Sequence, residues 1–356
     1  MSEIVPNQIL TKSDGGSPRL THPVRITEQV WPEGVTPVVS ICSLAYNHEK
    51  FIRKCLDGFF MQETAFPVEI LIQDDASTDN TANIIREYEK QYPHIIKPIY
   101  QKENQYSKGV NSSLTFILNC AKGKYIALCE GDDYWTAPNK LQMQVDFMES
   151  HPDYSGCFHN VNVVYEDGSK SMHPMLPQSF KNTFTVQDLA VDNCIPTCSN
   201  LFRARLFPDF PPWYARMPIG DWPLHVLNAE HGDIGYIDRI LAVYRVHGGG
   251  VWSSLHSEGF KISIQVAEAI DAHLGFKYTK AIRKNIAYWH YRLAVKMDME
   301  GADNGIFSHL ISSIRNCPSH EGISKRVILV IFIKHAFPIL YTRLKQVQKA
   351  LRSTHN

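Results

Sequence analysis

Two acidic clusters follow two apolar runs of the chain, and both carry residue types that can hold a metal ion. Asp74–Asp75 comes directly after the run 68–73, and Glu130–Asp133 comes directly after the run 124–129. In an open α/β sheet, ligands bind beyond the carboxyl ends of the strands. Carboxylates from two such strands can hold a hard divalent cation together with a phosphorylated ligand. The two clusters therefore predict metal-dependent chemistry on a nucleotide-linked substrate.

The second cluster is the stronger of the two signals. Its three carboxylates, Glu130, Asp132 and Asp133, repel one another unless a cation or a bound proton relieves the charge. The alternative is a loop whose acidic side chains all face water. For Asp74–Asp75 the alternative is a helix cap followed by a solvated turn.

Two further segments carry candidate residues, each with two interpretations. Asp221 stands between Gly220 and Trp222, where a helix is expected to begin. It is either an N-cap or a general base, which requires a partly buried carboxylate beside an acceptor hydroxyl. Arg245 and His247 follow an expected strand and precede three glycines. Either His247 closes a strand before a flexible loop, or both side chains approach a diphosphate.

The elements that must position these residues alternate between strand and helix from residue 37 to residue 150. Short apolar runs at 38–44, 68–73 and 125–129 predict buried strands, and residues 97–100 are expected to form another strand. The segments between them have the apolar spacing of helices. Short links between alternating strands and helices favour a largely parallel sheet with right-handed crossovers.

After residue 150 the pattern changes. Residues 157–165 and 234–246 are expected to form strands, and residues 258–316 are expected to form helices. The expected domains are a tail or loosely packed arm at 1–35, an α/β domain at 36–255 and a helical C-terminal region with a basic amphipathic tail at 256–356.

The composition is that of a globular enzyme, with 44% hydrophobic and 20% charged residues among 356. Lysine plus arginine equals aspartate plus glutamate, 36 against 36, so no global field favours a nucleic-acid partner. Eight cysteines without a CxxC pair indicate reduced thiols. The N-terminus has no apolar signal core, which also predicts a cytoplasmic protein.

The segment 323–352 contains seven basic residues and no acidic one, and they surround the apolar run 327–333. This run is too short to span a bilayer. A basic, apolar helix can lie on an anionic membrane surface, which predicts peripheral contact at the inner face of the membrane. The alternative is a C-terminal helix packed on the domain with its lysines in water.

Several common motifs are missing from the sequence. There is no GxGxxG dinucleotide fingerprint, no GxxxxGK[ST] P-loop, no HExxH zinc motif and no GxSxG nucleophile elbow.

The remaining motifs occur in the order typical of one family. They are Val38–Asn47 (VVSICSLAYN), Gln73–Asp79 (QDDASTD), Tyr125–Trp135 (YIALCEGDDYW) with Lys140 and Gln144 after it, Gly220–Trp222 (GDW) and Tyr244–His247 (YRVH). Over residues 36–252 the chain resembles the family 2 glycosyltransferases of the GT-A fold. The resemblance implies a Rossmann-like α/β fold with a mixed, mostly parallel sheet. It also implies a UDP-, dTDP- or GDP-linked sugar donor, a Mn²⁺ or Mg²⁺ ion and inversion at the anomeric carbon.

The resemblance also implies roles for individual residues. Asp221 matches the catalytic base, and Asp132 matches the metal ligand, together with His247. Glu130 stands where the family often has an aspartate, and its ligation of the metal stays open, as does which of Asp74 and Asp75 contacts the base. The expected donor-binding residues are Ala45, Asn47, Asp74, Asp75, Glu130, Gly131, Arg245, His247 and Trp252.

The sequence thus predicts an inverting, metal-dependent glycosyltransferase with a glycan or lipid-linked acceptor, as in bacterial surface polysaccharide assembly. The segment 169–216 is expected to select the acceptor. Two alternatives remain. A nucleotidyltransferase of sugar phosphates would carry a glycine-rich basic loop where 46–50 reads YNHEK. A non-catalytic nucleotide-sugar binding protein would need the binding residues but no base.

Overall fold

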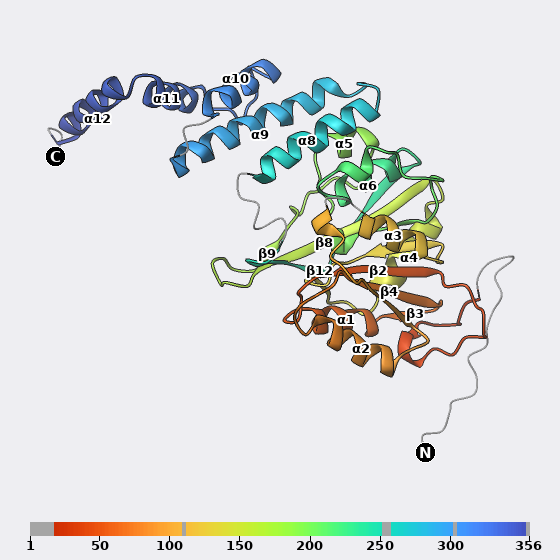
Figure 1. The fold of residues 1–356 in the computed structure, drawn as a ribbon. Helices are drawn as coiled ribbons and strands as arrows, with labels where there is room; N and C mark the ends of the chain where they lie inside the picture. The colour runs from red at the N-terminus through yellow and green to blue at the C-terminus, as the bar shows by residue number, and fades with distance from the viewer. Residues whose placement is uncertain (1–17, 109–111, 251–257, 302–304, 354–356) are drawn as a thin grey trace. The chain divides into compact units, whose positions relative to one another are not determined.

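The computed structural model describes residues 18–108, 112–250, 258–301 and 305–353 (Figure 1). The chain divides into two compact units. The first comprises Met1–Leu189 and Asn193–Ser253, and the second comprises Ala190–Asp192 and Ser254–Asn356.

The first unit alternates strand and helix up to residue 150, as the apolar pattern predicts. Its elements are β1 (Val24–Arg25), β2 (Val39–Ala45), α1 (Ile52–Phe60), β3 (Glu63–Thr64), β4 (Val68–Asp74), α2 (Thr81–Gln91), β5 (Ile96–Tyr100), α3 (Ser112–Cys120), β6 (Tyr125–Leu128), β7 (Tyr134–Trp135), α4 (Lys140–Ser150), β8 (Tyr154–Tyr165), β9 (His173–Pro174), β10 (Thr183–Phe184), α5 (Val186–Val191, which crosses the boundary between the units), β11 (Leu201–Arg203), α6 (Asp221–Ala229) and β12 (Asp233–Val246).

A mixed, 10-stranded sheet organises this unit, in the order β10-β12-β8-β11-β6-β2-β4-β5, with β7 on β12 and β9 on β8. β6, β2, β4 and β5 are mutually parallel. β11 is antiparallel to both β6 and β8, so β8 runs in the same direction as β6. β12 pairs in parallel with β8. The carboxyl ends of β2, β4, β6, β8 and β12 therefore all point to one edge, and the α/β fold expected from the sequence is confirmed.

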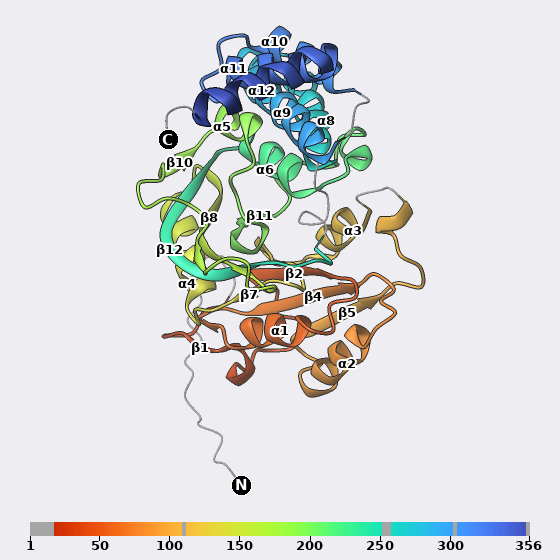
Figure 2. The same cartoon turned by 90° about the vertical axis from the view of Figure 1, so that its left-hand side faces the viewer.

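Helices cover both faces of the sheet. Alternate residues of β2, such as Ile41, pack with α1, α2 and α4 in one cluster of buried side chains. The intervening residues, such as Cys42, pack with α3 and α6 in another. Figure 2 shows α1 and α2 on one side of the sheet and α3 on the other. Strands buried on both faces explain why their sequences are continuously apolar rather than alternating.

The N-terminal arm packs more closely than its composition indicates. β1 pairs with β3, and Leu20 and Ile26 are buried. Gln29 is also buried, and its side-chain amide donates to the carbonyl oxygen of Thr64 at 2.6 Å. Residues 20–29 are therefore anchored to the first unit by backbone pairing and by a buried side chain.

The second unit is helical, as the pattern of residues 258–316 predicts. It contains α8 (Glu258–His273), α9 (Thr279–Glu300), α10 (Ile306–Asn316), α11 (Lys325–Ala336) and α12 (Pro338–Ser353). Ala294, Ile306, Leu310 and Ile331 form a small buried cluster that joins α9, α10 and α11. Within the described residues, no helix combines the length and the apolar character that crossing a bilayer requires.

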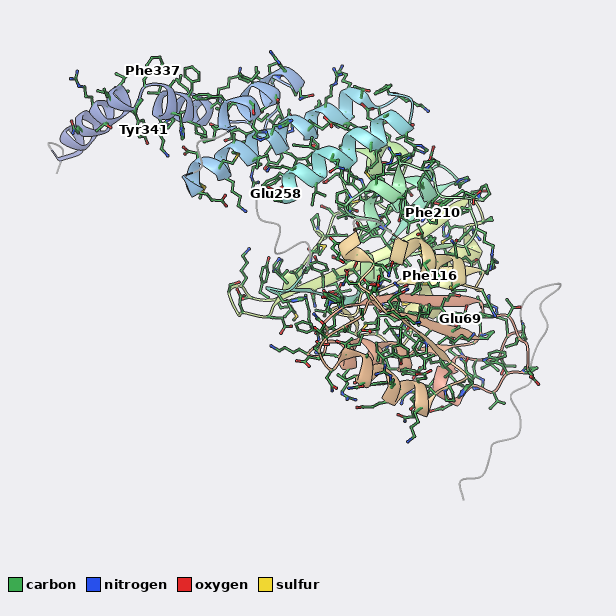
Figure 3. All side chains as sticks on the ribbon, in the orientation of Figure 1. Glu69, Phe116, Phe210, Glu258, Phe337 and Tyr341 are labelled. Carbon is green, nitrogen blue, oxygen red and sulfur yellow. The ribbon has the colours of Figure 1, made fainter. Side chains whose placement is uncertain are left out.

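Glu69 on β4 holds the starts of several strands together (Figure 3). It is buried, and its carboxylate accepts hydrogen bonds from Ser40 Oγ at 2.6 Å and Lys97 Nζ at 2.8 Å. It also accepts one from the backbone N–H of Lys122 at 2.8 Å. Burial alone raises the pKa of Glu69, but the donors from Lys97, Ser40 and Lys122 outweigh burial and lower the pKa overall.

We expect Glu69→Gln to lower the free energy of unfolding by about 1–3 kcal/mol, because the buried cluster loses its charged acceptor. The pKa of Glu69 in the folded state lies below its unfolded value of about 4.3. Its contribution is therefore present above that pH and is lost as the pH falls through the folded pKa. Urea unfolding between neutral and acidic pH should show the two proteins converging in acid.

The matched control is Glu87→Gln. Glu87 is exposed and pairs with Arg53 at 2.8 Å, so its loss should change the free energy of unfolding by only about 0–1 kcal/mol. A stability difference between wild type and Glu69→Gln that does not shrink in acid would contradict the assignment.

Candidate active site at the carboxyl edge of the sheet

The candidate residues from distant parts of the sequence gather at the carboxyl ends of four strands. Ala45 ends β2 and Asp74 ends β4. Glu130 follows β6 by one residue beyond Cys129, and His247 follows β12 directly. Because these strands run in the same direction, the loops beyond them lie at a single edge, where open α/β sheets bind ligands.

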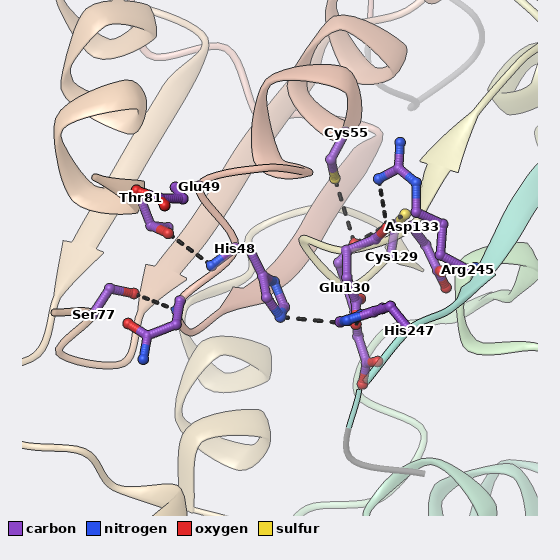
Figure 4. A network of polar contacts seen from close by, with 12 residues as sticks. His48, Glu49, Cys55, Ser77, Thr81, Cys129, Glu130, Asp133, Arg245 and His247 are labelled. Atoms are coloured by element: carbon purple, nitrogen blue, oxygen red, sulfur yellow. Dashed lines mark hydrogen bonds and ion pairs between the residues drawn. The ribbon is translucent and has the colours of Figure 1, made fainter. Parts of the chain in front are cut away.

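The loops after β2 and β4 are joined by direct hydrogen bonds (Figure 4). The backbone N–H of Asn47 donates to Ser77 Oγ at 2.9 Å, and Asn47 Oδ1 accepts from the N–H of Thr78 at 2.8 Å. The N–H of His48 donates to Thr81 Oγ1 at 2.8 Å. Ala45 is buried, and its carbonyl accepts from the N–H of Asp75 at 2.9 Å. Asn47 and Ala45 therefore hold the two loops in one fixed arrangement.

The two aspartates after β4 have different partners, although both are buried. The two carboxylate oxygens of Asp75 accept from the backbone N–H groups of Gln105 and Tyr106, at 2.9 and 3.0 Å. Asp74 Oδ2 accepts from the N–H of Ser77 at 3.3 Å. Its other oxygen, Oδ1, is buried and has no hydrogen-bond partner among the described residues. Asp75 thus anchors a neighbouring loop, whereas Asp74 retains an acceptor.

The segment Glu130–Asp133 is held mainly by the end of β12. Asp133 is fully buried, and its Oδ1 accepts from the backbone N–H of Arg245 at 2.8 Å. The guanidinium of Arg245 donates to the carbonyl oxygen of Asp132 at 2.7 Å and pairs with Glu166 at 3.1 Å. Arg245 therefore contacts the backbone of the acidic segment. Its expected contact with a diphosphate stays a prediction.

Close packing also constrains this segment. A Cβ on Gly131 would lie 2.9 Å from the ring of His48 and 3.1 Å from Cβ of Ala45. The N–H of Gly131 donates to the carbonyl of Leu44 at 2.9 Å. The thiol of Cys55 lies 3.4 Å from the carbonyl oxygen of Glu130 and donates to it. Only glycine fits at position 131 without moving these neighbours.

The carboxylates differ in charge state. Burial, together with the charges of Asp132, Asp133 and Asp221, raises the pKa of Glu130 well above its usual range. Its side chain nevertheless remains accessible to solvent. Burial and the charge of Asp132 likewise raise the pKa of Asp133. The interaction between Glu130 and Asp221 also places the start of α6 near the acidic segment.

Asp132 is the carboxylate that two histidines approach. His247 Nε2 lies 3.1 Å from Asp132 Oδ2, and His48 Nε2 lies 3.8 Å from the same oxygen. Burial acts to raise the pKa of Asp132, but the hydrogen bond from His247 and the nearby His48 lower it overall. Within the described residues, no three histidine, cysteine or acidic side chains converge as a complete metal site. Asp132 and His247 supply one carboxylate and one imidazole.

Asp221 is not the N-cap of its helix. It is the first residue of α6, after Gly220 at the cap position. Its carboxylate is bound by two residues that lie outside the helix. Asp221 Oδ2 accepts from Asn193 Nδ2 at 3.0 Å and from Thr197 Oγ1 at 3.4 Å. The side chain is half-buried, as a general base would require.

Asn193 is in turn held by a histidine one helical turn beyond Asp221. Asn193 Oδ1 lies 3.1 Å from Nδ1 of His225, which is fully buried. Burial lowers the pKa of His225 to about 4, so its ring is neutral at neutral pH, and the neighbouring Asp221 acts in the opposite direction. A carboxylate only accepts, so the Asn193 amide must turn its NH₂ toward Asp221 and its oxygen toward His225. His225 therefore carries its proton on Nδ1.

Sequence reasoning did not single out His48, Asn193 or His225. His48 stands in the YNHEK segment and could have been noticed there. Asn193 lies in a loop without a motif, so no local signal marks it. The expected donor residue Trp252 lies outside the described residues.

The sequence and the fold resemble those of known proteins. Residues 40–207 match the family described as Glycosyl transferase family 2. An uncharacterized protein of Mycobacterium tuberculosis is 40% identical over 262 residues, which are 71% of this chain and 74% of that protein. The Escherichia coli enzyme WfaP, named UDP-Glc:alpha-D-GlcNAc-diphosphoundecaprenol beta-1,3-glucosyltransferase, is 37% identical over 113 residues, or 32% of this chain and 42% of WfaP.

Among solved structures, Staphylococcus aureus TarS (1–349) in complex with UDP-GlcNAc has a TM-score of 0.57 at 19% identity. The match covers 89% of this chain and 92% of that one, and at this identity it shows a common fold. Taken with the family match, these likenesses show that the chain belongs to glycosyl transferase family 2 and is a glycosyltransferase of the GT-A fold.

Proposed function

We propose that this glycosyltransferase transfers a sugar from a nucleoside diphosphate to an acceptor hydroxyl with inversion at the anomeric carbon. The observation that carries the proposal is the meeting of the acidic segment, His247 and Asp221 at one edge of the sheet, where Asp221 acts electrostatically on Glu130. Asp74 lies at the end of β4 on the same edge. These are the groups that donor binding, leaving-group stabilisation and deprotonation of an acceptor require.

For the donor, Asp74 is the better candidate for direct contact with the base or ribose. Its Oδ1 has no partner among the described residues, whereas Asp75 already accepts two backbone N–H groups. TarS in complex with UDP-GlcNAc and the UDP-Glc in the name of WfaP favour a UDP-linked donor over dTDP- or GDP-linked ones. We assign the Asp75 side chain to positioning of the 104–108 loop.

Asp132 and His247 would hold a divalent cation, Mn²⁺ or Mg²⁺. The donor set fits such an ion because these cations are commonly bound by one or two carboxylates together with substrate phosphates. Asp132 Oδ2 and His247 Nε2, which lie 3.1 Å apart, would be the two protein donors. When bound, the ion would neutralise the charge that develops on the diphosphate leaving group.

Asp221 would act as the general base. The acceptor oxygen attacks the anomeric carbon while its proton passes to the Asp221 carboxylate. The bond between the anomeric carbon and the diphosphate breaks, and the nucleoside diphosphate leaves with the electron pair. One displacement without a covalent enzyme intermediate inverts the configuration.

Asn193 and His225 would act as positioning residues for this base. The Asn193 amide fixes one carboxylate oxygen of Asp221, and the neutral His225 fixes the amide. Because the amide cannot rotate without losing both bonds, the second carboxylate oxygen of Asp221 keeps one direction. Such support of a catalytic group by a further layer of hydrogen bonds sets its geometry within a fraction of an ångström.

The acceptor would be a glycan or a lipid-linked glycan, as the diphosphoundecaprenol in the name of WfaP suggests for a relative of partial length. A role in surface polysaccharide assembly fits such an acceptor. Within the described part of the chain no disulfide joins any of the eight cysteines, which fits a reducing compartment and a cytoplasmic location for the enzyme.

We expect UDP with Mn²⁺ to raise the melting temperature by about 5 °C at a hundredfold excess over Kd, because a ligand of the folded state stabilises it. Asp132→Ala should abolish the metal-dependent part of the shift. GDP, dTDP and CMP serve as comparison ligands, and Asp153→Ala, an exposed aspartate, serves as the control. A shift that is unchanged in Asp132→Ala would remove Asp132 from the metal site.

Asp221→Asn should lower turnover by about 10²–10⁴-fold, because the acceptor proton loses its base. The nucleotide-dependent melting shift should be retained, since the substitution preserves size. Release of the nucleoside diphosphate from the donor, in the presence of acceptor, measures turnover. Unchanged turnover in this variant would exclude Asp221 as the base, and absence of any turnover in the wild type would favour a nucleotide-sugar binding protein.

Asn193→Ala should lower kcat by about 10–100-fold and leave the KM for the donor within about twofold, because only the orientation of Asp221 is lost. His225→Asn, which retains an N–H donor, should preserve more of kcat than His225→Phe. Steady-state kinetics of the three variants measure the effect on kcat separately from the effect on the KM for the donor. Equal losses in kcat and donor affinity would show that Asn193 supports the fold of the site rather than the base.

A further inference from the structure

The last two helices present large apolar side chains to solvent. α11 packs on α9 and α10 through one side, where Ile331 is buried and Val327 and Ile328 are partly buried. Its other side and the start of α12 are exposed. The C-terminal apolar patch consists of Leu329, Val330, Phe332, Phe337, Ile339, Leu340 and Leu344, whose exposed fractions run from 42% for Val330 to 74% for Ile339.

The patch is continuous along the chain. Phe337 projects from the ribbon between α11 and α12, and its ring lies 6.3 Å from that of Phe332 (Figure 3). Leu340 and Leu344 follow one turn apart on α12. Exposed apolar residues that stand singly need no explanation, but a gathered set on consecutive helices marks an interaction surface.

The charge around the patch has one sign. Lys325, Arg326 and Arg343 are exposed on the same two helices. The segment 323–352 contains seven basic residues and no acidic one, although the whole chain is balanced at 36 against 36. The Lys334 ammonium pairs with Asp298 at 2.8 Å, which joins α11 to α9 within the second unit. The positive charge is thus a local property of the surface that carries the patch.

An apolar patch surrounded by positive charge indicates which kind of partner binds there. A second copy of the chain docked through the same patch would bring two positive segments together, which is unfavourable. A nucleic acid would meet the positive charge but would leave the apolar side chains in water. An anionic lipid surface provides both an apolar interior at its acyl boundary and opposite charge at its headgroups.

We propose that α11 and α12 dock on an anionic membrane surface. The C-terminal apolar patch enters the boundary between headgroups and acyl chains, and Lys325, Arg326 and Arg343 contact lipid phosphates. The helices lie on the membrane and do not cross it, in agreement with their length. Docking requires neither a particular sugar donor nor a working active site.

The test is co-sedimentation of the full-length protein with vesicles. One preparation is pure phosphatidylcholine, and the other is phosphatidylcholine and phosphatidylglycerol in equal parts. We expect binding to the anionic vesicles to be at least about tenfold tighter and to weaken as salt is added. Equal binding to both preparations, or no binding to either, would overturn the proposal.

Two multiple-substitution variants separate the apolar from the electrostatic contribution to vesicle binding. Leu340→Gln with Leu344→Gln should weaken binding at least about tenfold, and Lys325→Gln with Arg326→Gln and Arg343→Gln should remove most of the preference for anionic lipid. Met299→Gln, at a still more exposed apolar residue outside the patch, is the control and should bind as the wild type does. All substituted residues are exposed, so melting temperatures should be unchanged.

Sedimentation velocity completes the test. A concentration-dependent dimer that disappears in Leu340→Gln with Leu344→Gln, without vesicle binding by the wild type, would show that the patch joins two copies. That outcome would overturn the membrane proposal. A wild-type monomer that binds anionic vesicles would support it.

Discussion

Mutual repulsion among the carboxylates of Glu130, Asp132 and Asp133 is the constraint around which the first unit is built. Placing Asp132 and the buried Asp133 beside Glu130 is costly unless donors compensate their carboxylates. The end of β12 supplies most of the compensation, through the Arg245 backbone to Asp133, its guanidinium to the Asp132 carbonyl and His247 to the Asp132 carboxylate. The acidic segment is thus stable only in a sheet that delivers β12 to this edge.

Hydrogen bonds and close packing also fix the loops that surround the acidic segment. The loops after β2 and β4 are joined by hydrogen bonds between Asn47 and the segment 77–78, and Gly131 fits against Ala45 without space for a side chain. On the other side, Asn193 and His225 hold Asp221. A carboxylate on the first turn of a helix, held by a loop amide that a buried ring holds in turn, keeps one direction in the absence of a ligand.

Much of this could be predicted from the sequence, because its signals are local. Apolar runs predicted β2, β4 and β6, residues 97–100 were expected to be a strand and lie in β5, and helical spacing predicted the helices between them. The acidic clusters were expected at strand ends and lie there. The sequence predicts the structure less well where the local composition of a segment differs from the way the segment packs in the fold. The N-terminal arm has a loop-like composition, yet β1 pairs with β3 and buries Ile26, since backbone pairing does not depend on composition.

The sequence by itself determined the alternation of strands and helices between residues 37 and 150, the two acidic clusters and the family to which their spacing belongs. Only the tertiary structure decided which cluster residues retain acceptors, that Asp221 starts its helix rather than capping it, and that Asn193 and His225 support it. It also decided that β12 runs parallel to β8 and so brings His247 to Asp132 across 115 positions of sequence. Strand direction and side-chain partners arise from contacts between distant segments, and the local patterns of a sequence do not contain them.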